Sequence, residues 1–155
     1  MKKLIYMEFN PSFNRPDIIE RILYLSRQAT HISDVYISIS KSETLFNVLR
    51  IKNGVVIERS ILSFNDLLEY SLKECNKIAV LDENGEPDLN ILSSTDCYLA
   101  GLHTDIPYTE LREICRNRKC KRIKLANISY LASSLISILD LVNEVRAFLY
   151  ISILN

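Results

Sequence analysis

The chain has 155 residues, of which 48% are hydrophobic and 25% are charged, with 19 basic and 19 acidic side chains. We expect one domain spanning residues 1–155, because this length can bury a sizeable core and the composition is typical of a soluble globular protein. A membrane protein is not expected, since no stretch approaches roughly 20 consecutive apolar residues. The zero net charge does not exclude a nucleic-acid partner, because a local field matters more to a polyanion than the total charge.

The cysteines and the N-terminus predict a reduced, cytoplasmic protein. The four cysteines lack the paired short spacing of a metal site, and the chain does not begin like a signal peptide; the cysteines are Cys75, Cys97, Cys115 and Cys120. We therefore expect free, mostly buried thiols and no bound metal.

The N-terminal third has the pattern of a strand, a helix and a second strand. Residues 3–7 are an apolar run, residues 17–30 repeat apolar positions on one helical face after Pro16, and residues 35–39 alternate as in a strand. A strand, helix, strand order predicts parallel pairing of the two strands.

The middle of the chain has hairpin and capping signals. Asn53 and Gly54 separate two β-rich runs at 44–51 and 55–57, which is the strongest short hairpin signal. Ser63 is placed to cap a following helix, with Asp66 at its third position. The run 78–81 is fully apolar, as in a buried parallel strand.

The C-terminal part continues the alternation. We expect an acidic turn at 82–87, a strand at 96–99, a helix at 107–117, a strand at 119–125 and a long apolar helix from residue 128. The fold class is therefore α/β, with a mostly parallel sheet, helices on both faces and a small inserted β-hairpin. The apolar surplus of the last helix predicts a homodimer formed through that C-terminal helix.

Three loops leave strands at the same predicted edge of the sheet. They follow residues 81, 99 and 125, and Gly101 lies in the second, where a glycine lets a ligand approach the backbone. In an open α/β sheet, ligands bind at the carboxyl ends of the strands. The sequence therefore predicts a ligand site at this edge.

A basic run follows the glycine loop. Residues 112–124 contain seven lysines or arginines and one glutamate. We expect several of these cations to converge beside the glycine loop and to contact RNA phosphates, the alternative being an ordinary solvated face. The residues expected to bind RNA are Arg112, Arg116, Arg118, Lys119 and Lys121.

The three loops carry a family resemblance. Leu-Asp-Glu-Asn-Gly-Glu at 81–86, Tyr-Leu-Ala-Gly-Leu-His at 98–103 and Lys-Leu-Ala-Asn-Ile-Ser-Tyr-Leu-Ala-Ser at 124–133 resemble the SPOUT, or α/β-knot, methyltransferases. Within them the chain looks most similar to the archaeal tRNA pseudouridine methyltransferases. The resemblance implies a C-terminal trefoil knot, S-adenosylmethionine as cofactor, a dimer that completes each site, and RNA, in particular tRNA, as substrate.

The resemblance also implies which residues hold the cofactor. Backbone groups of the three loops would bind its adenine while apolar side chains flank the ring. These residues are Leu81, Leu99, Ala100, Gly101, Leu125, Ala126, Asn127, Ile128 and Leu131. A pseudouridine nitrogen must lose a proton before it accepts a methyl group, and His103, Asp105 and Asp82 are the candidates for the base. The two aspartates are equally typical of turns.

Two other functions fit the same fold. Ala126 and Asn127 stand where the family usually has a Gly-Pro pair, which leaves a non-catalytic RNA-binding dimer as one alternative. The other is a SPOUT protein that methylates a protein side chain.

Overall fold

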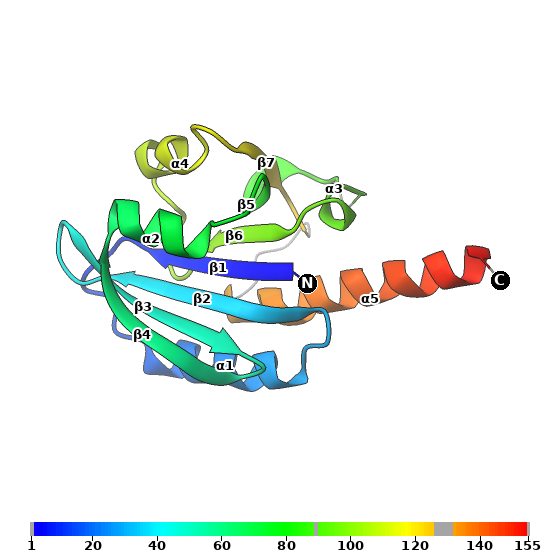
Figure 1. The fold of residues 1–155 in the computed structure, drawn as a ribbon, viewed down its shortest axis with the longest axis horizontal. Coiled ribbons are helices and arrows are strands. Elements are labelled where there is room, and N and C mark those ends of the chain that lie inside the picture. The colour runs from blue at the N-terminus through cyan, green and yellow to red at the C-terminus, as the bar shows by residue number, and fades with distance from the viewer. Residues whose placement is uncertain (1, 89, 126–131, 155) are drawn as a thin grey trace.

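One mixed sheet organises the molecule (Figure 1). The computed structural model describes residues 2–88, 90–125 and 132–154. In these residues seven strands pair in the order β4-β3-β2-β1-β6-β5-β7. The strands are β1 (Lys2–Glu8), β2 (Ile32–Ser40), β3 (Leu45–Lys52), β4 (Val55–Ser63), β5 (Lys77–Glu86), β6 (Cys97–Gly101) and β7 (Lys119–Ile123). All pairs from β2 across to β7 are parallel, whereas β3 and β4 are antiparallel, so the predicted mostly parallel sheet is confirmed.

Helices cover both faces of the sheet, as predicted. They are α1 (Pro16–Gln28), α2 (Phe64–Ser71), α3 (Asn90–Ser93), α4 (Tyr108–Ile114) and α5 (Leu135–Leu154), with a 3-10 turn η1 (Ala132–Ser134) before α5. Helices α1 and α5 pack on one face and α2 and α4 on the other (Figure 1). No helix in the described parts of the chain is long and apolar enough to cross a membrane.

The first strand, helix and strand form the expected parallel unit. Pro16 lies at the first position of α1, where its missing N–H is not needed. Ile22 is fully buried against the sheet. The helix ends two residues before the predicted 30, because Ala29 has an extended backbone. Strand β1 then lies between β2 and β6, at the centre of the sheet.

The predicted hairpin is confirmed and extends the main sheet. Asn53 and Gly54 have φ angles of 51° and 77°, the positive values that a type I′ turn requires. Strand β4 is longer than the predicted 55–57, since it runs to Ser63. The Ser63 hydroxyl accepts a hydrogen bond from Asp66 N at 3.2 Å, which confirms the predicted cap of α2.

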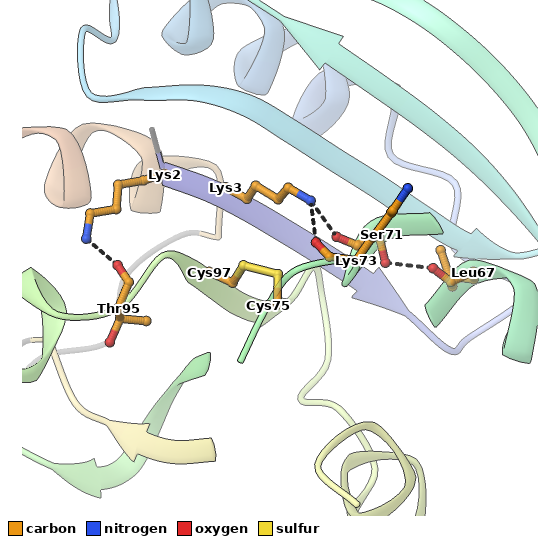
Figure 2. The surroundings of a disulfide bond; sticks show 8 residues. All are labelled: Lys2, Lys3, Leu67, Ser71, Lys73, Cys75, Thr95 and Cys97. Carbon is orange, nitrogen blue, oxygen red and sulfur yellow. Dashed lines mark hydrogen bonds between the residues drawn. A yellow bond between two sulfur atoms is a disulfide. The ribbon is translucent and has the colours of Figure 1, made fainter. Parts of the chain in front are cut away.

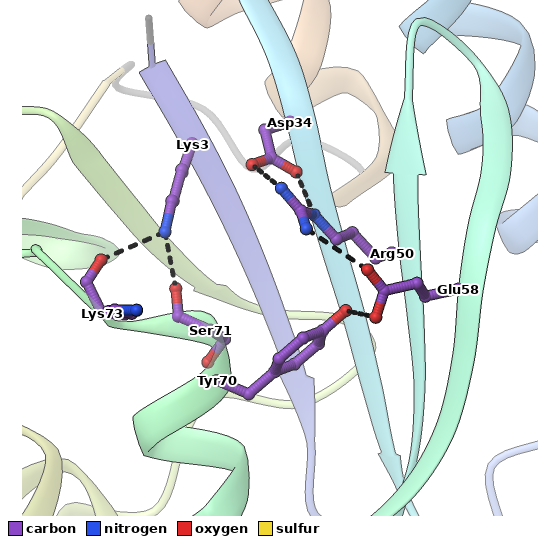
Figure 3. A network of polar contacts seen from close by, with 7 residues as sticks. All are labelled: Lys3, Asp34, Arg50, Glu58, Tyr70, Ser71 and Lys73. Carbon is purple, nitrogen blue, oxygen red and sulfur yellow. Dashed lines mark hydrogen bonds and ion pairs between the residues drawn. The ribbon is translucent and has the colours of Figure 1, made fainter.

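A polar network ties this hairpin to the rest of the sheet (Figure 3). Arg50 of β3 donates to both oxygens of the buried Asp34 on β2, at 3.2 Å each, and pairs with Glu58 of β4 at 3.4 Å. The Tyr70 hydroxyl of α2 donates to Glu58 at 2.6 Å. The pKa of Tyr70 is raised to about 12, mainly because the phenol is partly buried and secondly because of this hydrogen bond.

Three predicted boundaries in the C-terminal part are wrong. The acidic turn at 82–87 lies mostly within β5, where Leu81 and Glu86 both pair with Ile123 and the residues between them bulge out. The helix predicted at 107–117 ends at Ile114, and the strand predicted at 119–125 ends at Ile123. The predicted start of the last helix and the loop that would make the knot fall at 126–131, outside the described residues, so the knot stays a prediction.

The expectation of free thiols is also wrong, because all four cysteines are paired. Cys75 bonds Cys97, the first residue of β6, with the two Cα atoms 5.9 Å apart (Figure 2). Cys115, which ends α4, bonds Cys120 in β7. Cys97 and Cys120 lie toward the amino ends of β6 and β7, the two strands that flank β5. Only the folded sheet brings Cys75 and Cys97 together, so their spacing in the sequence gives no sign of the pair.

Candidate functional site

A cavity of about 330 Å³ opens at the carboxyl edge of the sheet. It lies among the ends of β5 and β6, the beginning of α1 and the beginning of α5. Its walls are formed by Arg15, Asp17, Ile18, Arg21, Leu81, Asp82, Glu83, Ala100, Gly101, Leu102, His103, Thr104, Asp105, Ala132, Ser133 and Leu135. This volume is in the range of small-molecule sites.

The parallel register explains why these segments meet. Met7 of β1 pairs with Gly101 of β6, and Val80 of β5 pairs with Leu99 of β6. The ends of β1 and β6 and the bulge of β5 after Leu81 therefore lie at one edge of the sheet, where the loops after β1 and β6 also leave it. Six predicted site residues line the cavity: Leu81, Asp82, Ala100, Gly101, His103 and Asp105.

Other predicted cofactor residues lie elsewhere. Leu99 is fully buried on the opposite face of the sheet, in the cluster that packs against α2 and α4. Leu125 packs at the margin of the other core cluster and is not part of the cavity wall. Ala126, Asn127, Ile128 and Leu131 lie outside the described residues.

The start of α1 is a wall that the sequence interpretation missed. Arg15 and Asp17 line the cavity and form an ion pair at 2.9 Å. Hydrogen bonding to Arg15 lowers the pKa of the Asp17 carboxyl. The signal was present, because β1 was predicted to be parallel, and the loop after a parallel strand leaves at the same edge as the others.

Strand β1 also holds the start of the last helix. The Tyr6 hydroxyl donates to the carbonyl of Ala132, a cavity residue, at 2.6 Å. Complete burial raises the pKa of Tyr6 well above its usual value, so this hydroxyl stays a donor. Tyr6 of β1 thus holds in place the part of the cavity wall formed by Ala132.

The three candidate bases differ in the hydrogen bonds and ion pairs that their side chains form. Asp82 Oδ2 accepts from Arg122 Nη2 at 2.7 Å and from Nε at 3.0 Å, and Oδ1 accepts from Asn84 N at 2.8 Å. A proton on Asp82 would disrupt this ion pair. Asp105, in contrast, has no hydrogen bond or ion pair with any described residue. His103 has an exposed ring whose centroid lies 6.2 Å from that of Phe13.

The basic run does not converge beside the glycine loop. Lys119 pairs in register with Lys77, at the amino end of β5, whereas Ile123 pairs with Leu81 at the cavity end. Four residues of strand separate the two positions by about 13 Å. The expected convergence is therefore wrong for Lys119 and for Arg116 and Arg118, which precede it.

Ion pairs also reduce the positive field of the run. Arg116 pairs with Glu113 at 2.8 Å, and Lys121 pairs with Glu86 and Asp88 at 3.3 and 3.4 Å. Two further arginines have other contacts: Arg118 donates to Ile114 O at 2.9 Å, and the Arg112 guanidinium lies 5.9 Å from the Tyr108 ring centroid. Whether the five predicted side chains, Arg112, Arg116, Arg118, Lys119 and Lys121, bind RNA stays a prediction.

No group of three or more histidine, cysteine, aspartate or glutamate side chains is placed to hold a metal in the described part of the chain.

Comparison with known proteins finds similarity in structure but not in sequence. No protein-family model matches the chain, and no curated protein matches its sequence. Among solved structures, Archaeoglobus fulgidus Nep1 bound to S-adenosylhomocysteine matches with a TM-score of 0.62 over 94% of this chain and 99% of that chain. The two proteins share a fold. The sequence identity is 13%, so the likeness to Nep1 shows the fold alone. It supports the SPOUT-like fold implied by the loop motifs, but not the particular branch.

Proposed function

We propose that the chain is an S-adenosylmethionine-dependent methyltransferase that acts on RNA, with a uridine or pseudouridine of tRNA as the target. The observation that carries the proposal is the cavity formed by the bulged part of β5 and the loop after β6, in a fold shared with a protein that binds S-adenosylhomocysteine. That molecule is what remains of S-adenosylmethionine once its methyl group has been transferred.

The cavity walls suit this cofactor chemically. Ile18, Leu81 and Leu135 offer apolar surface to an adenine ring. Asp105 brings a carboxylate without an ion-pair partner in the described residues, and such a charge favours the cationic sulfonium. Because the sulfonium is already a good leaving group, the protein mainly has to position the two reactants.

The side-chain contacts of His103, Asp105 and Asp82 indicate which of them can act as the base. His103 and Asp105 line the cavity and form no ion pair with a described residue, whereas Asp82 is engaged by Arg122. We therefore assign removal of the pyrimidine N–H proton to His103 or Asp105.

RNA is the proposed partner because cations lie at the cavity and at the far end of β7. Arg21 lines the cavity and forms no ion pair with another described residue, so a phosphate at the cavity mouth would be its partner. Lys119 is likewise outside every ion pair of the described residues and adds positive charge farther away. Cytoplasmic tRNA is the substrate that this proposal entails.

A homodimer through the C-terminal helix is part of the same proposal. Helix α5 extends well beyond the sheet (Figure 1). Leu141 and Val145 on it are 61% and 48% exposed, which is unusual for large apolar side chains on a helix that also contributes to the core. A second copy would cover them.

Methyl transfer to RNA tests the proposal directly. Unmodified tRNA is incubated with methyl-labelled S-adenosylmethionine and the wild type, and label in RNA is counted. Asp105→Asn and His103→Ala should each lower the rate, by roughly 100-fold for the true base. Label in protein instead would favour the protein methyltransferase. RNA binding without cofactor binding would favour the non-catalytic RNA-binding dimer.

A further inference from the structure

Glu8 is a buried carboxylate beneath the cavity that the proposed chemistry does not use. It ends β1 and has no exposed surface. Its Oε1 accepts from His103 N at 2.8 Å and from Thr104 N at 3.1 Å. Its Oε2 accepts from the Thr104 hydroxyl at 2.8 Å and from Asn10 N at 3.1 Å. Three of these four donors belong to the loop that follows β6.

These contacts explain how a carboxylate can be buried here. A buried charge is unfavourable unless hydrogen bonds compensate for the water that it loses. Glu8 takes part in no ion pair with a described residue, so its compensation comes from backbone N–H groups and one hydroxyl. Hydrogen bonds to an ionised acceptor are stronger than neutral ones. Glu8 and the loop after β6 therefore depend on each other.

The same loop is constrained from its other side by Gly101. A Cβ at this position would lie 2.0 Å from the carbonyl oxygen of Thr104 and 3.1 Å from the Cα of Asp105. The loop thus folds back on the glycine, and no side chain fits between them. Leu102 is 4% exposed and points into the core, while His103 and Asp105 stay exposed at the cavity.

We propose that Glu8 is a positioning residue, which holds residues 101–105 in the shape that binds the cofactor. This inference rests on the proposed function. Glu8 does not line the cavity, so it acts through the loop and not on the cofactor. It fixes the backbone of His103 and Thr104 by accepting from two consecutive N–H groups.

Two substitutions of Glu8 remove part or all of the hydrogen bonds that it accepts. Glu8→Gln keeps the shape and one acceptor oxygen, but it places an NH₂ group where Oε2 stood. The hydroxyl of Thr104 can turn to accept from it, whereas Asn10 N cannot. Glu8→Ala removes every acceptor and leaves the loop amides without a partner.

The control is Asp34→Asn, which alters a second buried carboxylate far from the cavity. Asp34 is 5% exposed, lies near the amino end of β2 and is held by Arg50. All variants are compared by calorimetric titration with S-adenosylhomocysteine and by hydrogen exchange of the amides of residues 103 and 104.

The expected results separate positioning from general stability. Leaving a buried donor unpaired costs about 10- to 100-fold in an equilibrium constant, so we expect Glu8→Ala to lose roughly this factor in affinity and Glu8→Gln less. Both should speed exchange of the two amides, while Asp34→Asn keeps wild-type affinity and exchange even if it melts earlier.

The outcomes are distinct. Wild-type affinity or unchanged amide exchange in Glu8→Ala would overturn the inference. A wild type that binds no S-adenosylhomocysteine would refute the proposed function and, with it, the cofactor role of Glu8. The exchange data would then still show whether Glu8 anchors the loop.

Discussion

The disulfide between Cys75 and Cys97 allows a quantitative prediction of stability. The bond closes a loop with a sequence separation of 22 residues, whereas the bond between Cys115 and Cys120 closes one of 5. The entropy lost by the unfolded chain grows with the logarithm of this length. It corresponds to about 3.4 kcal/mol for the longer loop and about 2.1 kcal/mol for the shorter one at 25 °C.

The assay is urea unfolding of two double variants beside the oxidised wild type. Cys75→Ala with Cys97→Ala should lower the free energy of unfolding by about 3.4 kcal/mol or more, because both side chains are buried and leave a small cavity. For a chain of this size the melting temperature should fall by roughly 7–14 °C. Cys115→Ala with Cys120→Ala should cost less.

Two results would refute this reasoning. One is an equal or smaller loss of stability for the Cys75 and Cys97 variant than for the Cys115 and Cys120 variant. The other is a titration of thiols in the unfolded, unreduced wild type that finds four per chain, since the paired cysteines predict none.

Three further predictions address the cavity, the polar network and pH. Gly101→Ala should weaken S-adenosylhomocysteine binding about 10-fold or more, because its Cβ would meet a loop carbonyl at 2.0 Å. Calorimetry should show that Gly54→Ala, which strains a turn far from the cavity, keeps wild-type affinity. Arg50→Met should lower the free energy of unfolding by about 2–3 kcal/mol, since it leaves the buried Asp34 carboxylate without its partner. Arg50→Met should cost less stability when Asp34→Asn is already present. If the losses of the two single variants simply add in the double variant, Arg50 and Asp34 do not interact. The raised pKa of Tyr70 means that the folded state favours the neutral phenol. The neutral phenol therefore contributes fully to the free energy of unfolding below pH 10, and this contribution is lost as the pH rises through about 12. In Tyr70→Phe the free energy of unfolding should no longer fall over this pH range. A variant with the same pH profile as the wild type would refute the role of Tyr70.

Local signals predicted much of the fold. The Asn53-Gly54 turn, the Ser63 cap and the position of Pro16 depend on a few adjacent residues, and all three are confirmed. The alternation of strands and helices was enough to place the cavity edge, because parallel strands end together. The short α3 was missed, since four residues are too few for a periodic pattern.

Nonlocal pairing accounts for what the sequence did not predict. Lys121 is neutralised by Glu86 and Asp88, acidic residues of a segment far along the chain, so counting charges over 112–124 overstated the local field. Glu8 looks like an ordinary polar residue at the end of a strand until the loop after β6 folds over it. The bond between Cys75 and Cys97 was missed for the same reason.

Calorimetric titration of the wild type with S-adenosylhomocysteine shows whether the cavity binds the cofactor product, with Gly101→Ala as the matched variant. We expect micromolar binding at one molecule per chain, which corresponds to about 8 kcal/mol, and clearly weaker binding by the variant. No binding at millimolar ligand by a folded wild-type protein would refute the proposed methyltransferase.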